Sequence, residues 1–232
     1  DAMIAAARKT NSVLSTYHNR HWDGCILRAM EQIKKEGVIG DIIRIECHMG
    51  GYNCPRDWWR SSKTISGGIL YDWGVHLLEY SLQLLEPAKI TEVSGFNHTG
   101  FWAPKTTWKD DTIEDEGFAA VRFDTGQWIN LTITSIDAKG KEGWVEITGT
   151  EGSYVFSGGD WKIVKHQNGE VVTTTGKNPD SEGEKYYQNI ADHLTKDETL
   201  VITPEWSRRP IHILDLAVKS AVANKALAAT HG

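Results

Sequence analysis

A succession of short strand-like segments fills the middle of the chain and limits the folds that it can adopt. Seven of them, separated by turn residues, lie near residues 90–98, 116–124, 127–136, 143–149, 153–157, 160–166 and 170–175. In the third, Ile129, Leu131 and Ile133 share one face, and polar side chains and Trp128 share the other. Turns as short as Thr125–Gly126 are typical of an antiparallel meander. We therefore expect one large, mostly antiparallel sheet.

Helical patterns surround these strands. Apolar residues recur at helical spacing near residues 1–9, 22–36, 70–85, 184–196 and 205–226. Two further strands are expected at 13–17 and 43–49. Strands in the middle with helices around them predict an α+β domain whose open sheet is covered by helices on one face. Because Trp128 would lie on the uncovered face, we expect that face to be buried against a second copy in a dimer or tetramer.

The composition of the chain limits the classes of binding partner and the cellular compartment that we expect. The chain has 232 residues, 40% of them apolar, and a net charge of −6, which argues against nucleic acid or an anionic membrane as a partner. No apolar run reaches the roughly 20 residues of a membrane span. Three cysteines without a CxxC pair favour a reducing cytoplasm. No metal site is expected, because Cys47 and His48 point to opposite faces of one strand.

The segment from Gly67 to His76 contains the candidate catalytic residues. A glycine pair opens a helix in which Asp72 and His76 are four residues apart and share one face. An imidazole beside a carboxylate can act as a general base near neutral pH, with the carboxylate fixing its tautomer. The alternative is a structural pair on a buried helix.

Several motifs in the same order resemble one family. They are Asn19-Arg20, Glu36-Gly37-Val38-Ile39-Gly40-Asp41, Trp59-Arg60, Gly67 to His76, Ile147-Thr148-Gly149-Thr150-Glu151-Gly152 and the last helix from Pro204. In this arrangement the chain resembles the glucose–fructose oxidoreductase/inositol dehydrogenase/rhizopine catabolism (Gfo/Idh/MocA) family. That family joins an N-terminal Rossmann domain, which binds NAD or NADP, to a C-terminal domain that binds substrate.

The resemblance implies roles for individual residues. His76 would be the general base toward a hydroxyl of a sugar, polyol or related carbohydrate, and Asp72 would orient it. Trp59 and Arg60 would meet the cofactor, with Trp59 also near the substrate. Arg20 and Tyr71 would contact the substrate. For Trp59, Arg60 and Arg20, a purely structural role is about equally plausible on residue type alone.

The chain departs from the family in one respect. No GxGxxG turn occurs in the sequence, and the family's Glu-Lys-Pro motif is also absent. We therefore expect residues 1–20 to be the last helix and strand of a Rossmann domain, and residues 21–232 to be the C-terminal substrate-binding and oligomerisation domain. The chain alone is expected to bind no NAD(P) and to be inactive. The choice between NAD and NADP stays open.

Two other functions use the same scaffold. One is an NAD-dependent glycosidase, which oxidises a sugar transiently and recycles its bound cofactor. The other is a non-enzymatic module for sugar sensing or oligomerisation. Asp72 and His76 count against the sensor, because a sensor needs no base.

Overall fold

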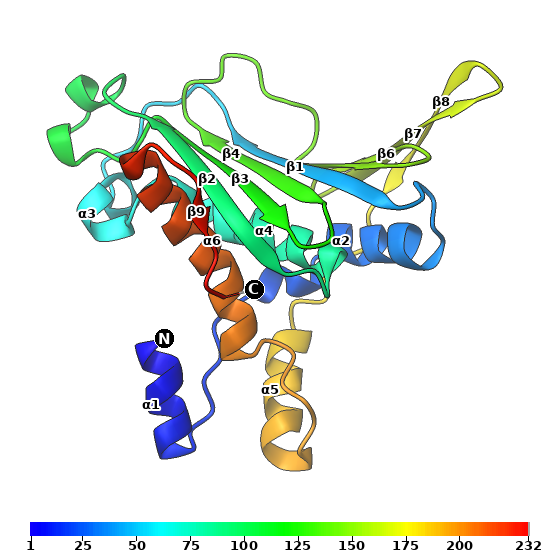
Figure 1. Ribbon diagram of the computed structural model, residues 1–232, viewed down its shortest axis with the longest axis horizontal. Helices are drawn as coiled ribbons and strands as arrows, with labels where there is room; N and C mark the ends of the chain where they lie inside the picture. The colour runs from blue at the N-terminus through cyan, green and yellow to red at the C-terminus, as the bar shows by residue number, and fades with distance from the viewer. Residues whose placement is uncertain (232) are drawn as a thin grey trace.

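A nine-stranded sheet forms the body of the protein, described here from a computed structural model over residues 1–231 (Figure 1). The strands are β1 (Ile42–Gly50), β2 (Ile90–His98), β3 (Glu116–Phe123), β4 (Trp128–Thr134), β5 (Val145–Gly149), β6 (Ser153–Phe156), β7 (Asp160–Gln167), β8 (Glu170–Lys177) and β9 (Leu227–Ala228). Their spatial order is β8-β7-β6-β5-β1-β4-β3-β2-β9. Every neighbouring pair is antiparallel except β1 and β4, which run parallel. The predicted α+β fold with a mostly antiparallel open sheet is confirmed.

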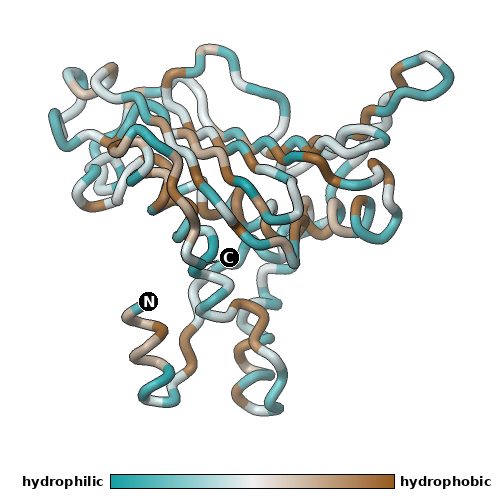
Figure 2. The backbone as a smooth tube through the Cα atoms, viewed as in Figure 1, coloured by the Kyte–Doolittle hydropathy of each residue, from teal (hydrophilic) through white to brown (hydrophobic). Residues whose placement is uncertain are grey.

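Helices cover one face of this sheet (Figure 1). The helices that pack on the sheet are α2 (Gly24–Ala29), α4 (Leu70–Leu85) and α6 (Pro204–Ala223), whereas α1 (Ala2–Thr10) and α5 (Lys185–Lys196) project away from it (Figure 1). A π-helical turn at Met30–Lys35 continues α2, and α3 (Lys63–Ser66) precedes α4. Short 3-10 turns lie at Asn19–Trp22, Trp59–Ser61, Ala103–Lys105 and Lys109–Asp111. Figure 2 shows hydrophobic residues gathered in the sheet and the helices beneath it, whereas the projecting loops are largely hydrophilic.

Alternation along the strands builds the core. Ile129, Leu131 and Ile133 of β4 point toward the helices and are buried, as predicted. Helix α4 lies against this face, and its Leu77 and Leu78 are fully buried. Burying an aliphatic side chain of this size contributes about 1.5–3 kcal/mol, so this layer anchors α4 and the residues that it carries.

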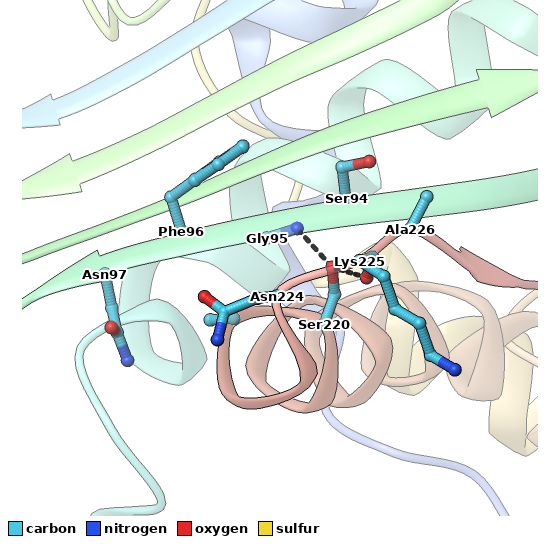
Figure 3. A pocket seen from close by; sticks show the side chains of 9 residues that line it. Ser94, Gly95, Phe96, Asn97, Ser220, Asn224, Lys225 and Ala226 are labelled. Atoms are coloured by element: carbon cyan, nitrogen blue, oxygen red, sulfur yellow. Dashed lines mark hydrogen bonds between the residues drawn. The ribbon is translucent and has the colours of Figure 1, made fainter.

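Helix α6 approaches β2 unusually closely. The Gly95 amide donates to Ser220 Oγ at 2.9 Å, and this hydroxyl donates to the Lys225 carbonyl at 2.6 Å (Figure 3). A Cβ at Gly95 would lie 1.9 Å from the Ala217 carbonyl oxygen. The absence of a side chain at Gly95 therefore sets the distance between α6 and the sheet.

Two local expectations fail. Residues 13–17 form no strand, because this short apolar stretch has no neighbouring strand with which to pair. Strand β1 does not keep strict alternation: a register shift between Ile42 and Arg44 leaves Ile43 exposed. The other predicted strands and helices appear within three residues of their expected bounds. Within residues 1–231, no helix has the length and apolarity needed to cross a membrane.

Candidate functional site

The start of α4 is built from two glycines and a distant carboxylate. Gly67 and Gly68 have φ angles of +89° and +127°, a backbone conformation that residues with a side chain rarely adopt. Glu114 accepts the Ile69 amide at 2.9 Å and pairs with Lys63 at 2.8 Å. A Cβ on Gly68 would lie 2.7 Å from this carboxylate. The glycine pair thus lets Glu114 reach the N-terminal end of α4, where a negative charge is favoured.

A pocket of about 600 Å³ opens beside the first turn of α4. Aromatic rings and charged groups line much of it, among them Trp58, Trp59, Arg60, Tyr71, Asp72 and Trp73. Trp58 and Trp59 are about half exposed, at 46% and 51%. Flat exposed rings of this kind can stack on a sugar or on another ring. Three of the predicted site residues, Trp59, Arg60 and Tyr71, therefore meet Asp72 at one pocket.

Arg60 holds the charged part of this pocket together. Its guanidinium lies 4.3 Å from the Trp59 ring centroid and 4.8 Å from that of Trp58. Its Nε donates to Asp72 Oδ1 at 3.3 Å. Asp72 and His76 do lie one turn apart on α4, as their spacing predicts. Among the described residues, however, the hydrogen bond that Asp72 accepts comes from Arg60, and none joins it to His76.

His76 lies half-buried on the next turn of α4, with its ring centroid 5.8 Å from that of Trp73. Burial, together with the positive charges of Arg20 and His18, lowers the pKa of His76 to about 4, although Asp72 and Asp23 act in the opposite direction. At neutral pH the imidazole is therefore unprotonated and able to accept a proton.

Arg20 connects His76 to the aromatic pocket. Its guanidinium lies 4.7 Å from the centroid of Trp73, a pocket-lining ring, and pairs with Asp23 at 2.9 Å. Asp23 also accepts the Tyr80 hydroxyl at 2.5 Å. Burial raises the pKa of Tyr80, so the phenol remains protonated. The segment Asn19–Trp22 is thus fastened to the face of α4 that carries His76.

Sequence reasoning missed a buried carboxylate on the same helix. Glu79 is fully buried and accepts hydrogen bonds from His18 Nδ1 at 3.0 Å, His21 Nδ1 at 2.6 Å and Trp206 Nε1 at 2.9 Å. Burial opposes its ionisation, but the two histidines outweigh that effect and lower the pKa of Glu79 to about 2. The signal was available: Glu79 is a lone charge in an apolar run, three residues after His76.

Comparison with known proteins identifies the family to which the chain belongs. A model described as "Oxidoreductase family, C-terminal alpha/beta domain" matches residues 31–228. The uncharacterized oxidoreductase YdgJ of Escherichia coli (strain K12) is 36% identical over 81 residues, which cover 34% of this chain and 23% of YdgJ. The scyllo-inositol 2-dehydrogenase (NADP(+)) IolW of Bacillus subtilis (strain 168) is 23% identical across 100% of this chain and 68% of IolW.

A solved structure agrees with the fold. Levoglucosan dehydrogenase, in complex with NADH and levoglucosan, superposes with a TM-score of 0.75 at 20% identity over 95% of this chain and 67% of that one. The chain thus spans about two thirds of the relatives that it matches from end to end, and about a quarter of YdgJ. From the match over residues 31–228, we conclude that the chain belongs to the Gfo/Idh/MocA oxidoreductase family and carries its C-terminal α/β domain.

Proposed function

We propose that the chain is the substrate-binding and catalytic part of an NAD(P)-dependent oxidoreductase that acts on a hydroxyl of a sugar, polyol or related carbohydrate. The observation that carries this proposal is the unprotonated, half-buried His76, one turn along α4 from an aromatic pocket. The names of two relatives, an inositol dehydrogenase and a levoglucosan dehydrogenase, support the substrate class.

Each side chain has a defined part in this proposal. His76 accepts the proton of the substrate hydroxyl as general base. Tyr71 and Arg20 contact the substrate, and Trp59 offers a ring on which a sugar can stack. Asp72, paired with Arg60, keeps the charge of the guanidinium balanced near the base.

The residues of the pocket also suit the nicotinamide end of a dinucleotide. The half-exposed rings of Trp58 and Trp59 can stack on a flat heterocycle, and the Arg60 guanidinium can meet a phosphate. The bound cofactor would supply the acceptor for the hydride. The sequence contains no GxGxxG turn, so we assign the rest of the dinucleotide to a Rossmann domain, of which residues 1–20 form the last part and which precedes the domain of residues 21–232.

Replacing the base tests the proposal. In the full-length enzyme, His76→Asn is expected to lower kcat by about 100-fold or more with sugars and polyols, since general-base catalysis typically contributes that much. His166→Asn is the matched control, because His166 is exposed on β7. Near-normal turnover of His76→Asn across the substrate panel would refute the role. Release of an aglycone without net NADH would instead indicate the NAD-dependent glycosidase.

We further propose that the chain forms a homo-oligomer through the uncovered sheet face, in the cytoplasm. Phe96 and Phe118 pair across β2 and β3 on that face, with ring centroids 5.9 Å apart, and Trp128 of β4 lies on it as well. Phe96 is 65% exposed and Trp128 is 36% exposed. Large exposed apolar side chains on one face are typical of an interface.

A further inference from the structure

We propose that Glu79 is a positioning residue for Arg20: by binding side chains on both sides of Arg20, it holds the turn that presents the guanidinium to the substrate. This inference rests on the proposed function, in which Arg20 contacts the sugar or polyol. Glu79 has no exposed surface, so it acts through Arg20 and does not touch the substrate itself.

Glu79 forms hydrogen bonds to the residues that flank Arg20. The 3-10 turn Asn19–Trp22 has Arg20 as its second residue. His18 Nδ1, two residues before Arg20, lies 3.0 Å from Glu79 Oε2. His21 Nδ1, in the residue after Arg20, lies 2.6 Å from Glu79 Oε1. Because the turn is held on both sides of Arg20, the backbone of Arg20 has little freedom to move.

The charge of Glu79 strengthens both contacts. Burial raises the pKa of Glu79, but hydrogen bonds from His18 and His21 outweigh burial, and the pKa lies at about 2. The group is therefore ionised at neutral pH. An ionised carboxylate only accepts hydrogen bonds, so the two Nδ1 atoms carry protons. Hydrogen bonds of this kind are roughly twice as strong as those between neutral groups.

The next residue of α4 orients the guanidinium of Arg20. Arg20 Nη1 donates to Asp23 Oδ2 at 2.9 Å, and the same oxygen accepts the Tyr80 hydroxyl at 2.5 Å. Asp23 directly follows the turn. Helix α4 thus acts on the turn through Glu79 and on the side chain of Arg20 through Tyr80 and Asp23.

Arg20 is held between the pocket and the candidate base. Its guanidinium lies 4.7 Å from the ring centroid of Trp73, which lines the pocket of about 600 Å³. The ring centroid of Trp73 lies 5.8 Å from that of His76. A guanidinium has five N–H donors, so several remain for substrate hydroxyls beside the one that Asp23 accepts. A misplacement of about 1 Å at such a group can cost a large factor in rate or binding.

Trp206 provides a comparison on the same carboxylate. Its Nε1 donates to both oxygens of Glu79 at 2.9 Å, but Trp206 belongs to α6 and not to the segment of Arg20. Loss of this donor leaves the turn attached to Glu79. Loss of the His21 donor detaches the turn on one side. A positioning role therefore predicts different effects at Arg20 from the two losses, whereas a purely structural role predicts similar ones.

Fluorine NMR tests the arrangement without any turnover. In the full-length enzyme labelled with 5-fluorotryptophan, the Trp73 signal is identified by its loss in Trp73→Phe and reports the guanidinium beside the ring. Arg20→Gln should shift this signal. Glu79→Leu removes both acceptors of the turn and should shift the signal in the same direction. An unchanged Trp73 signal in folded Glu79→Leu would overturn the inference.

A matched pair of milder variants keeps this test decisive if Glu79→Leu does not fold. His21→Phe and Trp206→Phe each remove one donor to Glu79 and each keep an aromatic ring. His21→Phe should shift the Trp73 signal, whereas Trp206→Phe should leave it in place. Equal effects of the two variants on the Trp73 signal would make Glu79 a purely structural residue.

Kinetics of the full-length enzyme provide the second test. Loss of a hydrogen bond from a charged donor weakens binding by about 10- to 100-fold. Arg20→Gln and Glu79→Leu should each raise KM for the sugar or polyol by about that factor with little change in kcat, because the base His76 is retained. Glu79→Gln keeps one acceptor and should recover part of the loss.

The double variant Arg20→Gln/Glu79→Leu separates action through Arg20 from a general effect. Its KM should be no higher than that of Arg20→Gln alone, since Glu79 has nothing further to position. Additive effects on KM would refute the positioning role. If the wild-type enzyme oxidises no sugar or polyol, the proposed function fails. The fluorine spectra still decide whether Glu79 sets the position of Arg20.

Discussion

Arg60 Nε lies 3.3 Å from Asp72 Oδ1, so the carboxylate that precedes His76 by one turn is paired with the arginine of the aromatic pocket. The charge of Asp72 still acts on His76, whose pKa it raises against the larger effects of burial, Arg20 and His18. Arg60 therefore pairs with the same carboxylate that raises the pKa of His76.

Removing Arg60 should change the basicity of His76. In Arg60→Gln the charge of Asp72 is no longer balanced, so the pKa of His76 should rise above its value of about 4. An NMR titration of the His76 ring protons measures this shift. Arg56→Gln is the matched control, because Arg56 lines the same pocket but forms no ion pair with Asp72 among the described residues. Equal titration curves for Arg60→Gln and the wild type would contradict the coupling.

The low pKa of His76 also makes a prediction for stability. The unfolded chain binds this proton near the ordinary pKa of 6.5, whereas the folded chain binds it only near 4. Between these values the unfolded state holds more protons, so the free energy of unfolding falls as the pH drops from about 6.5 to about 4 and this contribution levels off below. His76→Gln should lose less stability than the wild type over that interval. Urea unfolding at several pH values measures the difference, and parallel curves would exclude it.

Gly95 should tolerate no side chain. Gly95→Ala would bring a methyl group to within 1.9 Å of the Ala217 carbonyl oxygen, so α6 must shift away from β2. Overpacking of this kind costs about 1–3 kcal/mol of unfolding free energy. Gly159→Ala has no heavy atom within 4 Å of the new methyl group and should be nearly neutral. Chemical denaturation of the two variants compares them directly, and equal stabilities would show that α6 adapts without cost.

Assembly through the open face can be disrupted by one charge. Phe96→Glu places a carboxylate among exposed aromatic side chains and should shift the sedimentation profile toward the monomer. Val222→Glu is the control, because Val222 is a highly exposed apolar residue of α6, on the helix-covered side. A wild-type chain that sediments as a monomer, or an oligomer insensitive to Phe96→Glu, would point to another surface or to none.

Much of the fold could be predicted because local alternation determines local structure. Strand β4 shows this well: Ile129 and Leu131 repeat at a period of two, and both are buried on the helix side. Which strands pair with each other cannot be predicted from local alternation, since the parallel contact between β1 and β4 joins residues more than 80 positions apart. The strand predicted at residues 13–17 does not form, because no partner strand is available there.

In the candidate site, too, contacts within one helix could be predicted and contacts between distant segments could not. Asp72 and His76 could be placed on one helical face because four residues of one helix determine their relation. Neither the Arg60 contact nor the cluster around Glu79 follows from such spacing. Glu79 meets His18 from 61 positions away and Trp206 from 127 positions away. Such partners depend on how whole helices pack, which a periodic pattern does not describe.

Helix α6 joins two distant parts of the molecule. At one end Gly95 allows it to touch β2, and at the other its Trp206 donates to the carboxylate that holds two imidazoles. Because both contacts belong to one continuous helix, a displacement of α6 at β2 is expected to reach Trp206 as well. A side chain at Gly95 that pushes α6 away from β2 should therefore also disturb the donor that α6 supplies to the Glu79 carboxylate, at the other end of the helix.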